Sequence, residues 1–166
     1  MSKLYFSLLG PLLFLVACAP PEDEYSGIIK QNVAYEKLPI KRSSAQVIQM
    51  NDRVRVAIRT DSVFEGYSAK FKPNYREALR PLEDFLTSNK TPKQVVVSGY
   101  QGTIGNPNKL KKLSKLQAEA VAAYIWAMGI SIDSIKVEAY GVTKPVSDPS
   151  TASGNIENRR LNVDIF

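Results

Sequence analysis

The stretch 98–105 reads SGYQGTIG and directly follows a short apolar run at 94–97. A buried strand that opens into a loop with glycines at 99, 102 and 105 is typical of a place where the backbone approaches another group closely. The loop contains no acid, no base and no histidine. It also lacks the GxxxxGK[ST] and GxGxxG patterns of phosphate-binding loops. The chemistry that it offers is hydrogen bonding from backbone and amide groups.

The residue types elsewhere do not predict an enzyme. The 166-residue chain has no histidine and a single cysteine, so it cannot build a Ser-His-Asp triad, a Cys-His pair or a histidine-based zinc site. The carboxylates of Asp61, Glu65, Glu138 and Asp164 are scattered, without the spacing of a catalytic pair. We therefore expect no catalytic residue, no metal and no cofactor.

The N-terminal segment indicates where the protein resides. Residues 1–17 read MSKLYFSLLGPLLFLVA, in which Lys3 precedes an apolar stretch that is short for a bilayer span. This pattern predicts a signal peptide, and the alternative is a short transmembrane anchor. The junction LVAC at 15–18 resembles the bacterial lipobox, which implies an acylated Cys18. Ala19 follows the cysteine, and in that pattern it implies lipid anchoring at the periplasmic face of the outer membrane.

The rest of the chain divides into a tether and one domain. Residues 18–45 lack periodicity and contain a Pro-Pro pair at 20–21, an acidic run at 22–24 and scattered apolar residues such as those at 28–29 and 38–40. We interpret this region as a lipidated N-terminus and tether that holds one docking segment at most. Residues 46–166 are the predicted domain, which is large enough to bury a core.

Hydrophobic periodicity predicts the elements of this domain. Alternation at 53–59 indicates a strand, and helical spacing at 74–88 indicates a helix that Pro81 should kink or restart. A buried strand at 94–97 precedes a helix at 110–128, with Gly129 as its stop. The side chains expected to face inward from this helix are Leu113, Leu116, Ala120, Val121, Tyr124, Ile125 and Met128. Strands at 135–140 and 161–165 complete an α/β domain, with two helices on one face of a small mixed sheet.

Two basic clusters are candidate binding residues. The first lies at the start of the second helix, at Lys109, Lys111, Lys112 and Lys115. It is either a solvated helix face or a contact for an acidic partner, an anionic glycan or phospholipid head groups. The second is the run Asn158-Arg159-Arg160, which we expect to fasten the 141–157 loop beside the last strand. Nucleic acid is not an expected partner of an exported lipoprotein that lacks an aromatic platform.

The elements and motifs together resemble the OmpA-like domain, a peptidoglycan-associating module of outer-membrane proteins with the order β-α-β-α-β-β. The resemblance runs from about Arg53 to Phe166. The matching segments are Phe64 with SAKFKP at 68–73, Leu113-Ser114 and Ala118 against LSxxRA, Ala139-Tyr140-Gly141 and Pro145 against GYGxxxP, and Asn158-Arg159-Arg160-Leu161 against NRRV. Size and architecture alone also suggest the small OmpA-like lipoproteins of Dot/Icm type IVB secretion systems.

The resemblance also implies a role for the glycine loop. In the family the corresponding loop reads GHTDxxG, and its aspartate pairs with the ammonium group of diaminopimelate in peptidoglycan. Here Tyr100 replaces the histidine and Gly102 replaces the aspartate. The arginine of LSxxRA, which grips the ligand's carboxylate, is replaced by Gln117. We expect a degenerate site at which Gln101 and Thr103 offer only uncharged groups.

Asn155 and Ala139 also depart from the pattern, which has arginine and glycine at these places. The resemblance therefore implies a retained fold and a lost ligand. The preferred hypothesis is a non-catalytic, protein-binding part of an envelope-spanning assembly, with weak or absent peptidoglycan binding. The alternative is an anchor that still binds peptidoglycan and ties the outer membrane to the cell wall.

Overall fold

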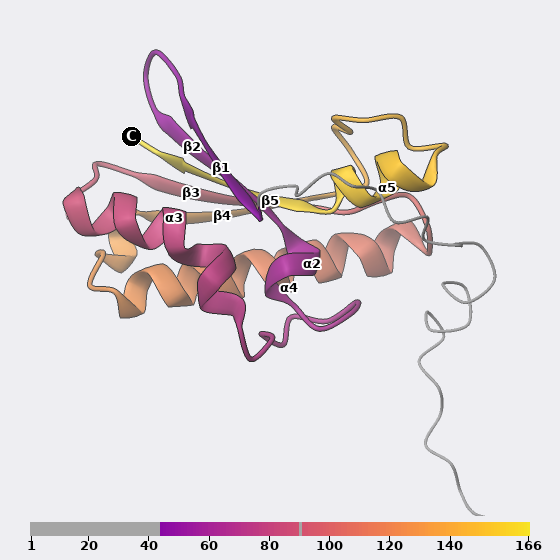
Figure 1. Ribbon diagram of the computed structural model, residues 1–166, viewed down its shortest axis with the longest axis horizontal. Helices are drawn as coiled ribbons and strands as arrows, with labels where there is room; N and C mark the ends of the chain where they lie inside the picture. The colour runs from indigo at the N-terminus through magenta and orange to yellow at the C-terminus, as the bar shows by residue number, and fades with distance from the viewer. Residues whose placement is uncertain (1–43, 90) are drawn as a thin grey trace, which may run out of the picture. The chain divides into compact units, whose positions relative to one another are not determined.

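The computed structural model describes residues 44–89 and 91–166 (Figure 1). The predicted signal peptide, Cys18 and almost all of the predicted tether lie outside the described residues. Within the described part, no helix is long and apolar enough to cross a bilayer.

One mixed five-stranded sheet organises the domain, with the strand order β1-β2-β5-β3-β4. Its strands are β1 Ala45–Gln49, β2 Val54–Arg59, β3 Val95–Tyr100, β4 Ile135–Gly141 and β5 Arg160–Ile165. Only β3 and β4 run parallel, and the other neighbouring strands are antiparallel. The C-terminal strand β5 thus lies in the middle of the sheet. The predicted fold class, α/β with helices on a small mixed sheet, is confirmed.

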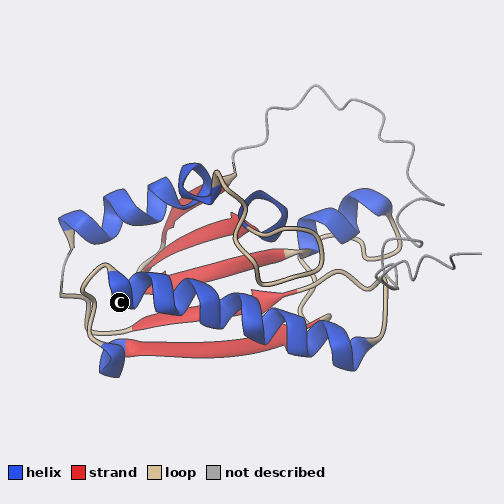
Figure 2. Cartoon of the chain, turned by 90° about the horizontal axis from the view of Figure 1, so that it is seen from below, coloured by secondary structure: helices blue, strands red, loops and turns tan. Residues whose placement is uncertain are grey.

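Two long helices, α3 Tyr75–Ser88 and α4 Pro107–Ala127, cover one face of this sheet (Figure 2). Helix α3 contacts β1 and β2, whereas α4 contacts β3 and β4. Helix α3 continues through Pro81 without a break in its assigned range, so the predicted restart does not occur. The short elements are α2 Thr60–Val63, η1 Ile132–Ser134 and α5 Ala152–Asn158.

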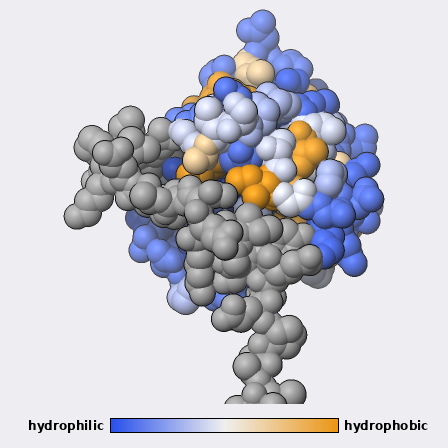
Figure 3. Space-filling view, turned by 90° about the vertical axis from the view of Figure 1, so that its right-hand side faces the viewer, coloured by the Kyte–Doolittle hydropathy of each residue, from blue (hydrophilic) through white to orange (hydrophobic). Residues whose placement is uncertain are grey.

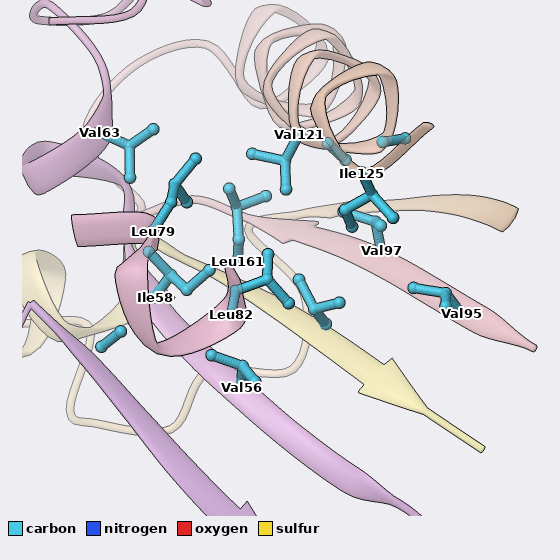
Figure 4. Close-up of a cluster of buried hydrophobic side chains, with 14 of the residues drawn as sticks. Val56, Ile58, Val63, Leu79, Leu82, Val95, Val97, Val121, Ile125 and Leu161 are labelled. Atoms are coloured by element: carbon cyan, nitrogen blue, oxygen red, sulfur yellow. The ribbon is translucent and has the colours of Figure 1, made fainter. Parts of the chain in front are cut away.

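The core lies between the helices and the sheet (Figure 4). In β2 the buried residues Val54, Val56 and Ile58 alternate with half-buried ones, because successive side chains of a strand point to opposite faces. Leu79 and Leu82 of α3 point into the same space from above the sheet. The pattern-based prediction of β2 works because only one of its faces is fully apolar.

Four elements were not predicted from the sequence, namely β1, α2, η1 and α5, and the longest of them are β1 and α5. Strand β1 begins at Ala45, the last residue assigned to the tether, and four of its five residues are exposed. An edge strand that buries one residue shows no alternating pattern. Helix α5 lies inside the predicted 141–157 loop; the hydroxyl of Thr151 caps it by accepting a hydrogen bond from the Gly154 N–H at 2.9 Å. It has only seven residues and no apolar stripe.

The inward face of α4 differs from its prediction. Leu116, expected inside, is 44% exposed. The fully buried stripe instead includes Leu110, Ser114 and Gln117. The other predicted inward residues are buried or half-buried, so the prediction is wrong at Leu116 alone. The hydrophobic pattern missed Ser114 and Gln117 because they are polar residues whose hydrogen bonds are satisfied inside the domain. The helix also begins at Pro107, three residues earlier than predicted, because the Asn106 side chain caps it.

This corrected face gives a direct test. Leu110→Ala should lower the free energy of unfolding by about 2–5 kcal/mol, because Leu110 is 1% exposed and its removal leaves a cavity. Leu116→Ala, a matched change on the same helix, should alter it by less than about 0.5 kcal/mol. Urea unfolding measures both. Equal losses in the two variants would contradict the assigned face.

Candidate functional site

The glycine loop is positioned by a close contact between strand β3 and helix α4. A Cβ atom on Gly99 would overlap the backbone carbonyl of Ser114, so only glycine fits here. The Ser114 hydroxyl accepts a hydrogen bond from the Gly141 N–H at 3.1 Å. The Gln101 N–H donates to the Gly141 carbonyl at 2.7 Å. The loop therefore starts where β3, β4 and α4 meet.

Gln101 and Gln117 join in a buried hydrogen-bonded chain beneath the loop. The Gln101 Nε2 donates to Gln117 Oε1 at 2.6 Å, and the Gln117 Nε2 donates to the Ser68 carbonyl at 2.8 Å. The two side chains are 3% and 2% exposed. Neither amide points outward toward a ligand. The uncharged replacement for the family's arginine is thus used to connect α4 to the 66–70 turn.

Asn155 of α5 fills the space beside Gly102. A Cβ atom at position 102 would lie 2.8 Å from Asn155 Oδ1 and 2.9 Å from its carbonyl oxygen. The same Oδ1 accepts hydrogen bonds from the Thr103 N–H at 2.7 Å and the Thr103 hydroxyl at 3.0 Å. Asn155 Nδ2 donates to the carbonyls of Pro149 and Thr151. An aspartate at position 102 does not fit unless α5 moves.

This role of Asn155 was missed in the sequence analysis, which noted only that it departs from the family pattern. Positions 102 and 155 both depart from the family pattern, and these two departures taken together would have indicated the role of Asn155, because Gly102 and Asn155 contact each other. A residue that loses its side chain leaves space, and a neutral amide can then fill that space.

Residues 158–160 make contacts with two different parts of the domain. Asn158 Oδ1 accepts hydrogen bonds from the N–H groups of Val146 and Ser147, and Arg160 Nη2 donates to the Lys144 carbonyl at 3.1 Å. These two residues hold the 141–157 segment. Arg159 instead forms a bidentate pair with Asp61, at 3.0 and 2.6 Å, beside β2.

Tyr100 is part of a stack of rings and cations. Its ring lies parallel to that of Tyr140, with centroids 5.0 Å apart. The Arg160 guanidinium lies 3.8 Å from the Tyr100 ring centroid, and the Lys144 ammonium lies 3.8 Å from that of Tyr140. A hydrogen bond to Glu138 raises the pKa of Tyr140. Tyr100 is 7% exposed, so it is a structural part of the sheet rather than a residue aimed at solvent.

The lysine cluster lies on the surface of the first turns of α4. Lys109, Lys111, Lys112 and Lys115 are all exposed. Lys115 lies 3.6 Å from the Glu119 carboxylate, one turn further along the helix. Figure 3 shows the end of the domain that carries α5, where the described surface is largely hydrophilic with a few hydrophobic residues among the polar ones.

A metal site and a pocket were also considered among the described residues. Within residues 44–89 and 91–166, no group of three or more His, Cys, Asp or Glu side chains is arranged to hold a metal ion. One depression of about 590 Å³ is lined by residues such as Phe85, Pro92 and Phe166. None of the loop residues or basic residues described above lines it.

Comparison with known proteins decides the family. The profile of the OmpA family matches residues 63–159. The chain belongs to this family. Among the solved structures that resemble it is the cell wall anchor of the type VI secretion system from Pseudomonas aeruginosa, with 28% identity and a TM-score of 0.65 over 74% of this chain and 87% of that one. The OmpA-like domain of FopA1 from Francisella tularensis, at 20% identity and a TM-score of 0.54, supports the fold alone.

Two lipoproteins are among the relatives of this OmpA-family chain. The probable lipoprotein YiaD of Escherichia coli is 25% identical over 127 residues, which cover 76% of this chain and 57% of YiaD. The outer-membrane lipoprotein YfiB of Pseudomonas aeruginosa is 33% identical over 92 residues, which cover 55% of this chain and 54% of YfiB. The chain thus spans just over half the length of either lipoprotein. The predicted family resemblance is confirmed, and these relatives support an envelope location.

The closure of the loop by Asn155 can be measured. Asn155→Ala should lower the free energy of unfolding by about 1–3 kcal/mol, because it leaves buried polar groups of the loop and of α5 without partners. The Thr103 amide should also exchange its hydrogen faster. Ser153→Ala, an exposed position on the same helix, is the matched control and should change neither quantity. If the Thr103 amide stays protected in the Asn155 variant, another group closes the loop.

Proposed function

We propose that this OmpA-family chain is a non-catalytic outer-membrane lipoprotein, and that its domain is a protein-binding structural part of an envelope-spanning assembly. A type IV secretion system outer-membrane complex is one such assembly. The observation that carries the proposal is the closed state of the loop that corresponds, by the family resemblance, to the diaminopimelate site. Asn155 fills the corner at Gly102, and Gln101 and Gln117 bond to each other.

The energetics of a charged ligand support this proposal. Diaminopimelate carries ammonium and carboxylate groups, and burying them requires opposite charges or dense hydrogen bonding. Removal of one partner from a buried charge pair costs about 2–5 kcal/mol, and here both the acid and the base are replaced by Gly102 and Gln117. The remaining amides would also have to break existing hydrogen bonds before they could bind the ligand. Peptidoglycan binding is therefore weak or absent.

Lipid anchoring rests on the N-terminal sequence and on the relatives. Cys18 follows an apolar segment in a lipobox-like junction, and Ala19 favours sorting to the outer membrane. Two relatives named as lipoproteins, YiaD and YfiB, support this assignment. Several acyl chains on one cysteine would hold the protein stably at the membrane.

The second candidate function is a peptidoglycan-binding anchor. It is favoured by the similarity to the type VI secretion system's cell wall anchor at 28% identity. Thr103 is exposed at the mouth of the loop and offers the one uncharged side chain of the degenerate site that faces solvent. In this alternative, backbone groups and Thr103 replace the missing charges.

Sedimentation with purified peptidoglycan of the diaminopimelate type distinguishes between the two candidate functions. The full-length protein, kept soluble in detergent, should remain in the supernatant, because its site lacks charged ligands. A family member that retains the aspartate and the arginine should pellet and serves as the positive control. Pelleting of this chain, reversed by free diaminopimelate, would establish the anchor function instead. Restoring an aspartate at Gly102 is not a usable control, because its Cβ would press on Asn155.

A part of a protein assembly also needs a contact surface. Trp126 at the end of α4 is 58% exposed, and Ile132 of η1 is 60% exposed. Large exposed apolar residues of this kind favour protein contacts. A photo-reactive amino acid at either position in living cells should give discrete cross-links to other envelope proteins. The same probe at Arg80, an exposed polar position on α3, should give none. Equal labelling at all three positions would contradict a specific surface here.

A further inference from the structure

Two arginines lie side by side on the sheet face opposite the helices. Gly99 faces α4, so its neighbour Tyr100 points to the other face of β3. Arg160 is the direct cross-strand partner of Tyr100 in β3 and of Arg59 in β2. Directly opposite residues of antiparallel strands project from the same face. Arg59, Arg160 and Tyr100 therefore form one row across three strands.

Other arginines near this row have a carboxylate partner. Arg55, on the same face of β2, forms a bidentate pair with Asp164 of β5 at 2.7 and 2.8 Å. Arg159 is paired in the same way with Asp61. These pairs follow the usual rule that a positive charge in a folded domain is balanced by a nearby acid. The carboxylates of Asp164 and Asp61 are thus already engaged.

Arg59 and Arg160 break this rule. Among the described residues, neither forms an ion pair with a carboxylate. Arg160 contacts the Tyr100 ring and the carbonyls of Lys144 and Asn158, all of which are uncharged. Burial lowers the pKa of Arg160; Tyr100 opposes this shift and Arg55 adds to it. Like charges on directly opposite strand positions destabilise a sheet, so the pair calls for an anion.

Arg59 also carries an unsatisfied donor. Like that of Arg53, its Nε is inaccessible to solvent and has no hydrogen-bond partner among the described residues. A buried N–H without an acceptor is uncommon in native proteins and points to a group that binds there. Arg160 lies directly opposite Arg59 on the neighbouring strand, so an acceptor for this N–H lies near a second arginine position. An oxyanion with two oxygens meets this requirement, because it can accept from both forks.

We propose that Arg59 and Arg160 form a carboxylate-binding site against the Tyr100 ring. Arg160 already donates one N–H from each terminal nitrogen to a carbonyl, and the donors that remain suit a planar carboxylate with two oxygens better than a phosphate. This inference stands apart from the proposed function, because it uses the opposite face of the sheet from α4 and Gln117.

The carboxylate has two possible sources, which an experiment can separate. The Arg59 N–H donates to the Ser44 carbonyl at 3.0 Å, so the chain enters β1 beside the site. The acids upstream of this point are Glu36 and the run at 22–24. Either one of these or an acidic side chain of another protein supplies the same chemical group.

The test follows the Nε–H signals of the arginines by ¹⁵N NMR in the full-length protein. Acetate is added at constant ionic strength, with phosphate in a parallel series. The Arg59 and Arg160 signals should shift and saturate with acetate, whereas Arg55, held by Asp164, and the exposed Arg80 should not respond. Arg59→Gln should weaken the response of Arg160 at least tenfold. Arg59→Lys keeps the positive charge but lacks the planar guanidinium donors, so it should also weaken the response of Arg160.

Each outcome has a defined meaning. Saturation in the unmodified chain supports an external carboxylate. Saturation only after Glu36→Gln, or after neutralisation of the acids at 22–24, supports an internal one, because the chain's own acid then occupies the site. Phosphate binding without acetate binding overturns the carboxylate assignment. The absence of a response in every variant, with unchanged backbone amide spectra, overturns the site itself.

Discussion

The close contact between Gly99 and Ser114 is the constraint on which the rest of the domain depends. Because no Cβ fits between strand β3 and helix α4 at this point, the helix approaches the sheet more closely than larger residues would permit. The Ser114 hydroxyl then reaches the N–H of Gly141, which fixes the end of β4 beside the start of the glycine loop. One contact thus sets the position of the loop, of the buried Gln117 on the same helix and of the neighbouring parallel strand.

The loop that this contact positions is closed by hydrogen bonds within the domain. In the family pattern a carboxylate and a guanidinium face a charged ligand. In this chain the corresponding positions are Gly102 and Gln117, and Asn155 has moved a neutral amide into the vacated space. Hydrogen bonds among uncharged groups avoid the desolvation cost of unpaired charges, so a closed loop is stable without a ligand. This is the physical reason for favouring a structural role over peptidoglycan binding.

The two faces of the sheet have different properties. The face toward α3 and α4 is apolar and holds the core, whereas the opposite face carries an ordered series of polar and charged side chains. On this opposite face Arg55 forms a bidentate ion pair with Asp164. The uncompensated arginines beside Tyr100 differ from them in this respect. The carboxylate site that we propose at the Arg59–Arg160 row therefore lies on the face opposite the hydrophobic core.

The sequence by itself determined the family and the main strands and helices, because strand alternation, helical spacing and motif order are local properties. It missed β1, which buries one residue, and it misassigned Leu116, because the inward face of α4 contains polar residues. Only the tertiary structure decided that Asn155 fills the corner at Gly102 and that Arg159 and Arg160 have different partners. These features depend on contacts between residues 16 to 98 positions apart, and no local pattern encodes such contacts.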